Sequence, residues 1–114
     1  SAMFSHAFLR AARHGLMEGD ENGMLRAAGL RALDALVTTR LVREDGATRL
    51  AGICQVAGLG ALSGPYRDGS PQYYLTEAVV ADDAKGVGPM MMAVAESVRD
   101  NAAEPRRTRS ETVG

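Results

Sequence analysis

Residues 66–98 read YRDGSPQYYLTEAVVADDAKGVGPMMMAVAESV. The stretch opens with a polar, turn-rich loop and ends in an apolar run that follows Asp82, Asp83 and a Gly-x-Gly. All three tyrosines of the chain lie in this stretch, and the chain contains no tryptophan. Because binding residues concentrate in loops held by rigid elements, we expect a site where this loop meets the helix.

The end of this stretch predicts a helix over residues 84–100, capped by Asp82 or Asp83. Its apolar residues cover most of the helix circumference, which predicts burial on more than one side. They are Val87, Met90, Met91, Met92, Val94, Ala95 and Val98. We interpret the three methionines as core residues. Residues 101–114 are polar and nearly free of large apolar side chains, so we expect a disordered tail.

Upstream, the apolar periodicity predicts two further helices. The first covers residues 1–16, with Ser1 as a candidate cap and Gly15 ending it. The second covers residues 23–40, is amphipathic, and has Asn22 or Asp20 as its cap. The short connection between them predicts an antiparallel helical hairpin.

Residues 41–54 change character. The Asp45-Gly46 dipeptide is a strong turn signal and predicts a short β-hairpin. Several glycines after it indicate a long irregular loop, with residues 73–75 as a short extended piece. We therefore expect an all-α fold class, with about three helices, a short β-hairpin and a long loop.

Composition narrows the possible functions. A chain of 114 residues is sufficient for one small domain, and a net charge of −1 gives no electrostatic reason to expect nucleic acid or an anionic membrane as partner. No window is apolar enough to span a bilayer. The one cysteine, Cys54, fits a reducing compartment, so we expect a cytoplasmic location. His6 and His14 lie about two helical turns apart, too far to share a metal, and we predict no metal and no cofactor.

With these residues in view, the chain resembles the C-terminal part of the unsaturated uronyl hydrolases, glycoside hydrolase families 105 and 88. The resemblance covers residues 1–100. It is carried by Ser1-Ala2-Met3-Phe4, Arg13-His14-Gly15, Gly52-x-Cys54, Gly58-x-Gly60, Tyr66-Arg-Asp-Gly-Ser-x-x-Tyr-Tyr-Leu and Asp82-Asp83-x-Lys85-Gly86-Val87-Gly88. Two departures stand out: Asp82 replaces the family's usual Asn, and Pro89 with three methionines replaces an aromatic-aliphatic run.

The resemblance implies a partial (α/α)6 barrel for residues 1–100. It also implies hydration of a 4,5-unsaturated uronate, in which an aspartate donates a proton across the double bond and activates water. The resulting hemiketal then collapses and releases the sugar. The family's catalytic carboxylates lie upstream of the matched region, so we assign no catalytic residue and expect this chain to be inactive alone.

Five residues are candidates for substrate binding. Arg67 suits a uronate carboxylate through its planar guanidinium, and Tyr66 suits a sugar hydroxyl or ring face. A solvated surface turn explains both equally well. For Asp82, helix capping is favoured over substrate contact. Lys85 belongs to the same motif, and Ser1 either donates to a sugar hydroxyl or only caps its helix.

The first and third predicted helices are apolar enough to need neighbours, either the remainder of the barrel or a second copy. A different class of function therefore stays open: a stand-alone helical interaction module that self-associates and has no catalysis. Another sugar enzyme with an α/α barrel, such as an epimerase or a lyase, also fits the fold.

Overall fold

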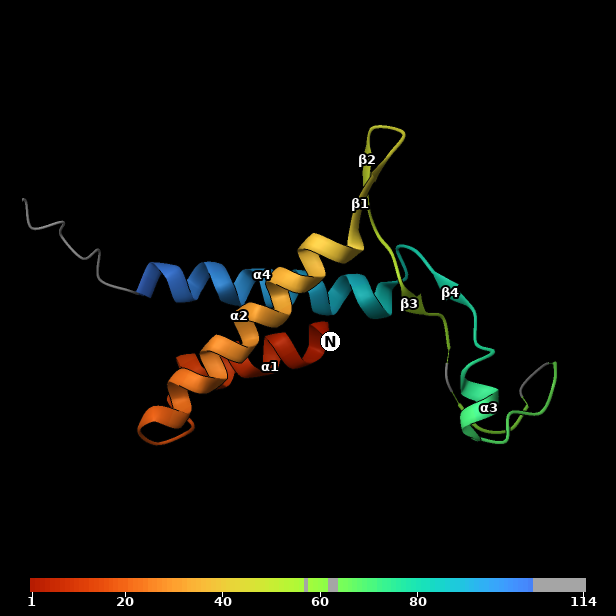
Figure 1. Ribbon diagram of the computed structural model, residues 1–114, viewed down its shortest axis with the longest axis horizontal. Helices are drawn as coiled ribbons and strands as arrows, with labels where there is room; N and C mark the ends of the chain where they lie inside the picture. The colour runs from red at the N-terminus through yellow and green to blue at the C-terminus, as the bar shows by residue number, and fades with distance from the viewer. Residues whose placement is uncertain (57, 62–63, 104–114) are drawn as a thin grey trace, which may run out of the picture.

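The computed structural model describes residues 1–56, 58–61 and 64–103. Three long helices carry most of this part of the chain. A β-hairpin projects from them in one direction, and an arm with the other two short strands and one helical turn projects in another (Figure 1). The elements are α1 (Ala2–Arg13), α2 (Asp20–Arg40), β1 (Leu41–Glu44), β2 (Ala47–Leu50), β3 (Ile53–Cys54), α3 (Pro71–Tyr74), β4 (Val79–Val80) and α4 (Ala84–Ala103). The prediction of a mainly helical chain is confirmed.

The first helix ends where its glycine predicts. Gly15 adopts a φ of 62°, a left-handed conformation that glycine adopts without steric cost. Its N–H donates to the carbonyl of Ala12, and the N–H of Leu16 donates to the carbonyl of Ala11. This pair of hydrogen bonds is the Schellman motif. At the other end, Ser1 occupies the N-cap position, but its side chain makes no capping hydrogen bond.

The start of α2 differs from the prediction. The helix begins at Asp20, its N-cap is Gly19, and no side chain caps it. Asn22 is therefore inside the helix, and its amide donates to the carbonyl of Ala12 in α1 at 2.8 Å. An Asn side chain near a helix start can cap that helix or donate to a carbonyl at the end of a neighbouring one. Here it closes the end of the helical hairpin.

The strands form two separate pairs. β1 and β2 are antiparallel with Leu41 opposite Leu50, and the turn between them has positive φ at Asp45 and Gly46. That geometry matches the predicted Asp-Gly hairpin. β3 was expected in the same hairpin but pairs with β4 instead, through Ile53 opposite Val80. This second pairing joins the chain on both sides of the long loop.

The expected extended piece at residues 73–75 is wrong. The structure has a helical turn, α3, whose N-cap Ser70 accepts a hydrogen bond from the N–H of Tyr73 at 3.1 Å. Pro71 occupies the start of this turn, where its missing N–H costs nothing. Ser70-Pro71 marks the start of this helical turn, and it outweighs the strand preference of the two tyrosines that follow.

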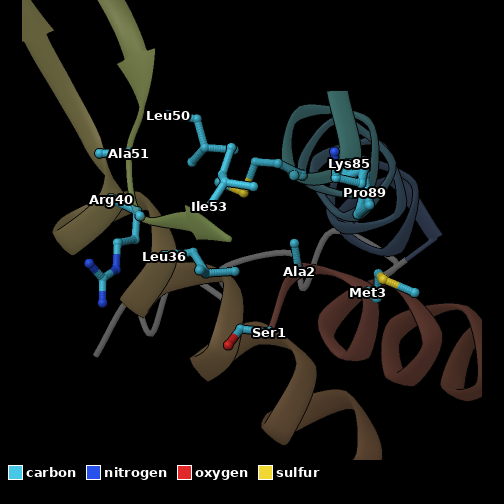
Figure 2. Close-up of a pocket in the computed structure, with 13 residues that line it drawn as sticks. Ser1, Ala2, Met3, Leu36, Arg40, Leu50, Ala51, Ile53, Lys85 and Pro89 are labelled. Atoms are coloured by element: carbon cyan, nitrogen blue, oxygen red, sulfur yellow. The ribbon is translucent and has the colours of Figure 1, made fainter. Parts of the chain in front are cut away.

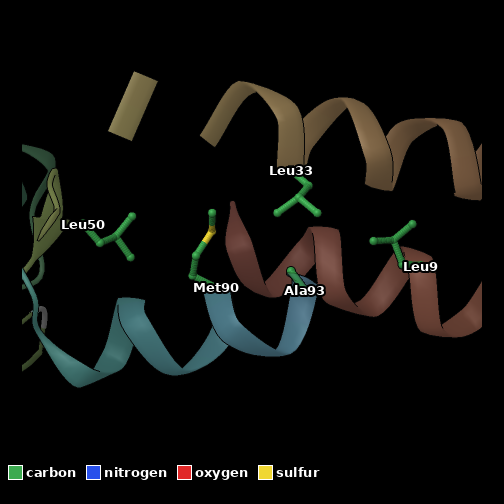
Figure 3. Close-up of a cluster of buried hydrophobic side chains, with 5 residues drawn as sticks. All are labelled: Leu9, Leu33, Leu50, Met90 and Ala93. Carbon is green, nitrogen blue, oxygen red and sulfur yellow. The ribbon is translucent and has the colours of Figure 1, made fainter. Parts of the chain in front are cut away.

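The core lies where α1, α2 and α4 meet the end of β2. Its buried residues are Leu9, Leu33, Leu50, Met90 and Ala93 (Figure 3). α2 runs antiparallel to α1, and Gly29 of α2 packs directly on Leu9. α4 runs parallel to α1 (Figure 1): both helices begin beside one pocket, and their far ends are joined by Arg13 and Glu96.

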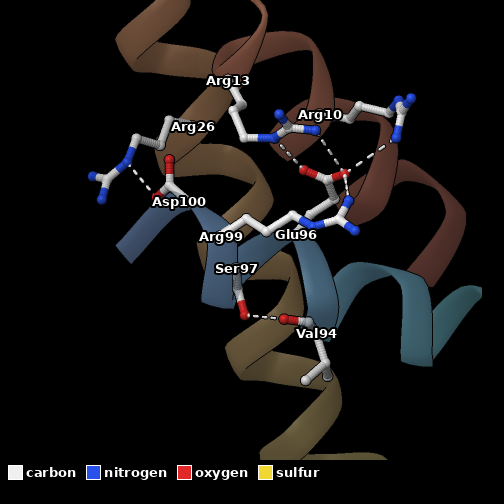
Figure 4. Close-up of polar contacts among 8 residues, drawn as sticks. All are labelled: Arg10, Arg13, Arg26, Val94, Glu96, Ser97, Arg99 and Asp100. Atoms are coloured by element: carbon white, nitrogen blue, oxygen red, sulfur yellow. Dashed lines mark hydrogen bonds and ion pairs between the residues drawn. The ribbon is translucent and has the colours of Figure 1, made fainter. Parts of the chain in front are cut away.

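A buried carboxylate joins those far ends. The side chain of Glu96 is 2% exposed and receives hydrogen bonds from Arg13 at 2.8 and 3.2 Å, from Arg10 at 3.3 Å and from Arg99 at 3.4 Å (Figure 4). The hydrogen bond from Arg13 is the main cause that lowers the pKa of Glu96 to about 2, against the opposing effect of burial. Beside it Arg26 of α2 donates to Asp100 at 2.7 Å, which joins α2 to α4.

The last helix is buried on one side only, so the prediction of burial on several sides is wrong for the described residues. Met90 is 5% exposed, whereas Met91 and Met92 are 67% and 51% exposed. The methionines are therefore not all core residues, because no described element covers the side of α4 that carries Met91 and Met92. The helix also continues through residues 101–103, which were expected in the tail. Residues 104–114 lie outside the described residues. No helix among those described is both long and apolar enough to cross a membrane.

Candidate functional site

A pocket of about 250 Å³ lies at the end of the molecule where α1 and α4 both begin (Figure 2). Its walls come from four parts of the chain: the first residues of α1, the end of α2, the segment from β2 to β3, and the first turns of α4. The polar side chains in the lining are Ser1, Arg40 and Lys85, and the rest is glycine or apolar. Figure 2 shows these residues on separate elements around the pocket.

Two glycines allow these walls to approach closely. Gly52 has a φ of 78°, and a Cβ there would lie 2.8 Å from Nη1 of Arg40. Gly86 lies against Ile53, whose Cδ1 would be 2.5 Å from an added Cβ. Any larger residue at either position would push the Arg40 side chain or the start of α4 outward. Gly86, the first glycine of the Gly-x-Gly, is thus needed for close packing of α4 against Ile53.

Asp83 holds Lys85 at the start of α4. Its carboxylate accepts the N–H of Lys85 at 2.9 Å and pairs with the Lys85 ammonium at 2.9 Å. These contacts, first the one with the ammonium, hold the pKa of Asp83 below its usual range. Of the two aspartates proposed as the cap, Asp83 is therefore the one that caps this helix.

The side chains that line the pocket carry positive charge, one of them the Lys85 ammonium that pairs with Asp83. Arg40 and Lys85 line the pocket, and no Asp or Glu is among the described residues that line it. The N-terminal ends of α1 and α4 add partial positive charge in the same place. Arg40 makes no hydrogen bond or ion pair with another side chain in the described structure, so its guanidinium is available to a ligand.

A second hollow of about 480 Å³ lies in the projecting arm. It is lined by Val56, Pro65, Tyr66, Arg67, Tyr73, Thr76 and Glu77. The Arg67 side chain is tied to its own loop, because its Nε donates to the carbonyl of Gly60 at 3.0 Å. Tyr66 is 76% exposed. The structure therefore brings Tyr66 and Arg67 together, and it separates them from Ser1 and Lys85.

Asp82 lines neither hollow. It has a φ of 58°, its carboxylate accepts the N–H of Leu50 at 2.8 Å, and it pairs with Arg49 at 3.1 Å. Its own N–H donates to the carbonyl of Leu50 at 2.9 Å. These bonds join the end of β2 to the start of α4. Because Asn and Asp tolerate left-handed backbone, the family's usual Asn suits the same conformation.

Asp82→Ala should therefore lower the free energy of unfolding by about 1–2 kcal/mol. Alanine adopts the left-handed backbone conformation at a cost, and the Leu50 N–H loses its acceptor. Asp82→Asn should cost less than about 1 kcal/mol, because it keeps the backbone preference and an acceptor oxygen and loses only an exposed ion pair. Urea unfolding followed by circular dichroism measures both. Equal losses in the two variants would show that the Arg49 pair, and not the conformation, matters.

Two lining residues were missed by sequence reasoning. Arg40 was treated only as the end of the second helix, and Gly52 only as part of a motif. Gly52 was the signal in the sequence that could have indicated this contact, because a glycine at a strand end leaves room for a long side chain from a neighbouring element. Among the described residues, no group of three His, Cys, Asp or Glu side chains is placed to hold a metal ion.

Three comparisons bear on this fold. The sequence profile of Glycosyl Hydrolase Family 88 matches residues 1–100. Two curated proteins, Protein Atu3128 of Agrobacterium fabrum and the 24.9 kDa protein in the picA locus of Rhizobium radiobacter, are each 62% identical over 99 residues. The match covers 86% of this chain and 42% of each of them.

A solved glycoside hydrolase of family 105 from C. acetobutylicum has the same local fold. It superposes with a TM-score of 0.74 at 33% identity, over 87% of this chain and 26% of that structure. The chain thus spans less than half the length of the curated relatives and about a quarter of the solved one. Its helices correspond to part of a helical barrel, and with the family profile over residues 1–100 they show that the chain belongs to Glycosyl Hydrolase Family 88.

Proposed function

We propose that this chain is part of a hydrolase acting on unsaturated uronyl oligosaccharides, and that the pocket where α1 and α4 begin binds the acidic sugar. The observation that carries the proposal is the charge of that pocket. Two cationic side chains and no described carboxylate line it, in a chain that belongs to a glycoside hydrolase family. A uronate is a sugar with one carboxylate, so it matches both properties.

Each candidate residue then has a defined role. Lys85 and Arg40 bind the uronate carboxylate by charge-assisted hydrogen bonds, which are stronger than neutral ones. The Ser1 hydroxyl donates to a sugar hydroxyl. Tyr66 and Arg67, in the separate hollow, contact the sugars that follow, and Asp82 supports the site by holding β2 against α4.

The proton donor lies outside this chain, because the pocket offers no described carboxyl group to donate a proton. In the proposed reaction an aspartic acid protonates the 4,5 double bond and water adds to C5. The hemiketal formed opens and breaks the glycosidic bond. Such a step requires no metal and no cofactor, and the carboxyl needs a pKa suited to proton donation. The reaction belongs to intracellular, cytoplasmic sugar breakdown.

Lys85→Met should weaken binding of an unsaturated uronyl disaccharide about tenfold, the effect of losing one charge-assisted hydrogen bond. Arg40→Met should have a similar effect, with Asp83–Lys85 left intact. Titrations followed by nuclear magnetic resonance of the backbone amides give the dissociation constants and show whether shifts concentrate at this pocket.

Arg31→Met is the matched control, because Arg31 is an exposed cation of α2 outside the lining. It removes the same charge and should leave affinity unchanged. Equal weakening by all three variants, or equal affinity for a neutral disaccharide, would count against the proposal. Turnover by the chain alone, seen as loss of ultraviolet absorbance by the double bond, would contradict the external proton donor.

A further inference from the structure

The carboxylate of Asp83 lies beside the pocket without lining it. It pairs with the Lys85 ammonium at 2.9 Å and accepts the N–H of Lys85 at 2.9 Å. The Asp83 side chain is 19% exposed and that of Lys85 is 59% exposed. Because Lys85 lines the pocket and Asp83 does not, one of the two pocket cations is balanced by a carboxylate from outside the lining.

The second cation of the pocket has no such partner. Arg40 reaches the pocket from the end of α2, on a different wall from Lys85 (Figure 2). Within the described part of the chain its guanidinium pairs with no carboxylate. The other aspartate at the start of α4, Asp82, is already paired with Arg49 at 3.1 Å and does not line the pocket. Of the two pocket cations, Arg40 is therefore the one without a counter-charge.

We infer that Asp83 is a specificity-determining residue: by balancing Lys85, it restricts the pocket to sugars with a single negative charge and disfavours sugars with two. The inference rests on the proposed function, because it narrows which acidic sugars the pocket accepts. A uronate carries one charge, whereas a sugar phosphate carries about −1.5 to −2 near pH 7.

Electrostatics gives the direction of this preference. Attraction to the pocket rises in proportion to the charge of the ligand. The cost of taking an ion out of water rises with the square of its charge, so a doubly charged ligand needs a larger surplus of positive charge to bind. With Asp83 ionised, the surplus is the charge of Arg40. Removing the charge of Asp83 adds that of Lys85 to it.

Helix capping is the competing role for the same carboxylate. An oxygen acceptor is sufficient for a cap, and asparagine or serine provides one as well as aspartate does. A counter-charge, in contrast, requires the ionised carboxylate. The two roles are therefore separated by variants that keep an oxygen at position 83 and remove its charge. A role in capping alone predicts no dependence on the charge of the ligand.

The test compares galacturonate with galactose 6-phosphate, which carry one and about two charges on the same carbon atom. Nuclear magnetic resonance titrations at constant, low ionic strength give the dissociation constants. The native chain should bind galacturonate more tightly than the phosphate. Asp83→Asn should bind galacturonate about two- to fivefold more tightly than the native chain does, the effect of one exposed charge. It should bind galactose 6-phosphate about four- to twentyfold more tightly, because the effect on the logarithm of affinity is about twice as large.

Three controls isolate the charge of Asp83. Asp83→Ser should match Asp83→Asn, because both keep a capping oxygen. Glu18→Gln removes the same charge at an exposed position beyond the far end of α1 and should leave both affinities unchanged. The length of α1, about 18 Å by its rise per residue, exceeds the Debye length of about 8–10 Å. In about 1 M salt, where the Debye length is about 3 Å, the difference between Asp83→Asn and the native chain should largely disappear. Circular dichroism checks that the variants are folded.

Two results would overturn the inference: a native chain that already prefers the phosphate, or an Asp83→Asn variant that changes both affinities by the same factor. Failure of the proposed function looks different. A native chain that binds no acidic sugar contradicts that function, but Asp83→Asn should still bind galactose 6-phosphate, with shifts at the amides of Lys85 and Gly86. If this variant binds no phosphate either, both the proposed function and the inference are wrong.

Discussion

Replacing Glu96 with glutamine should lower the free energy of unfolding by about 3 kcal/mol, near the lower end for removing one partner of a buried ion pair. Glu96 is nearly inaccessible to solvent and accepts hydrogen bonds from three arginines. Glutamine keeps the shape but removes the charge that holds α1 to α4. The loss stays near the lower end because Arg10 and Arg99 are half exposed and can turn to water. Urea unfolding measures the loss.

The same group sets a dependence on pH. The pKa of Glu96 is lowered from 4.5 to about 2 in the folded chain, so its stabilisation is complete above the unfolded value. It is lost as the pH falls from about 4.5 toward about 2. The melting temperatures of the native chain and of Glu96→Gln should therefore converge over that range. Glu18→Gln, at an exposed position, is the control and should follow the native curve. A constant difference in melting temperature between native and Glu96→Gln down to pH about 2 would show that the ionised charge of Glu96 is not responsible for the loss.

Leu9→Ala should lower the free energy of unfolding by about 2–5 kcal/mol, as large-to-small changes in a core do. Leu9 is fully buried, and its side chain fills the contact between α1 and α2 against Gly29. Thermal and urea unfolding measure the effect. A cost similar to that of an exposed substitution such as Met24→Ala would contradict the packing of this contact.

The facing residue gives the matched experiment. An added Cβ at Gly29 would lie 2.8 Å from Cγ of Leu9 and 3.2 Å from its backbone nitrogen. Gly29→Ala should therefore destabilise the chain by about 1–2 kcal/mol despite the better helix propensity of alanine. Gly23→Ala, in the same helix with nothing within 4 Å, should stabilise it by up to about 1 kcal/mol.

The effects of Leu9→Ala and Gly29→Ala on the free energy of unfolding should also be coupled. In the double variant the alanine at position 29 occupies space that Leu9 vacates, so the combined cost should be smaller than the sum by about 1 kcal/mol. Additive costs would show that α1 and α2 separate freely at this contact. The bond from Ser5 Oγ to the carbonyl of Gly29 at 2.8 Å argues against such freedom, because it fixes the distance between the helices.

Local signals predicted the long elements well. The 3.6-residue periodicity gave three helices, Gly15 gave the end of the first, and Asp45-Gly46 gave the hairpin turn. Each depends on neighbours in sequence, since a left-handed glycine or a positive-φ turn is satisfied by hydrogen bonds a few residues away. For the candidate site, the sequence indicated Ser1 and Lys85, which the structure brings to one pocket.

Other features depend on contacts between distant residues. Asn22 was expected, with Asp20 as the alternative, to cap its own helix. Its amide instead donates to the carbonyl of Ala12 in α1, which lies within reach only after the hairpin forms. Asp82 was expected to cap the last helix or to contact substrate. Its carboxylate instead accepts a hydrogen bond from Leu50 and joins β2 to α4. Arg40 became a pocket residue only because Gly52 leaves room beside it.

By itself the sequence determined where helices and turns form, because those choices depend on backbone conformation and on side chains one or two turns apart. The tertiary structure alone decided which side of α4 is covered. Met90, Met91 and Met92 are chemically identical, and only the positions of α1, α2 and β2 around α4 make the first buried and leave the others exposed. Burial is a property of what lies opposite a side chain, and periodicity along one helix does not contain that information.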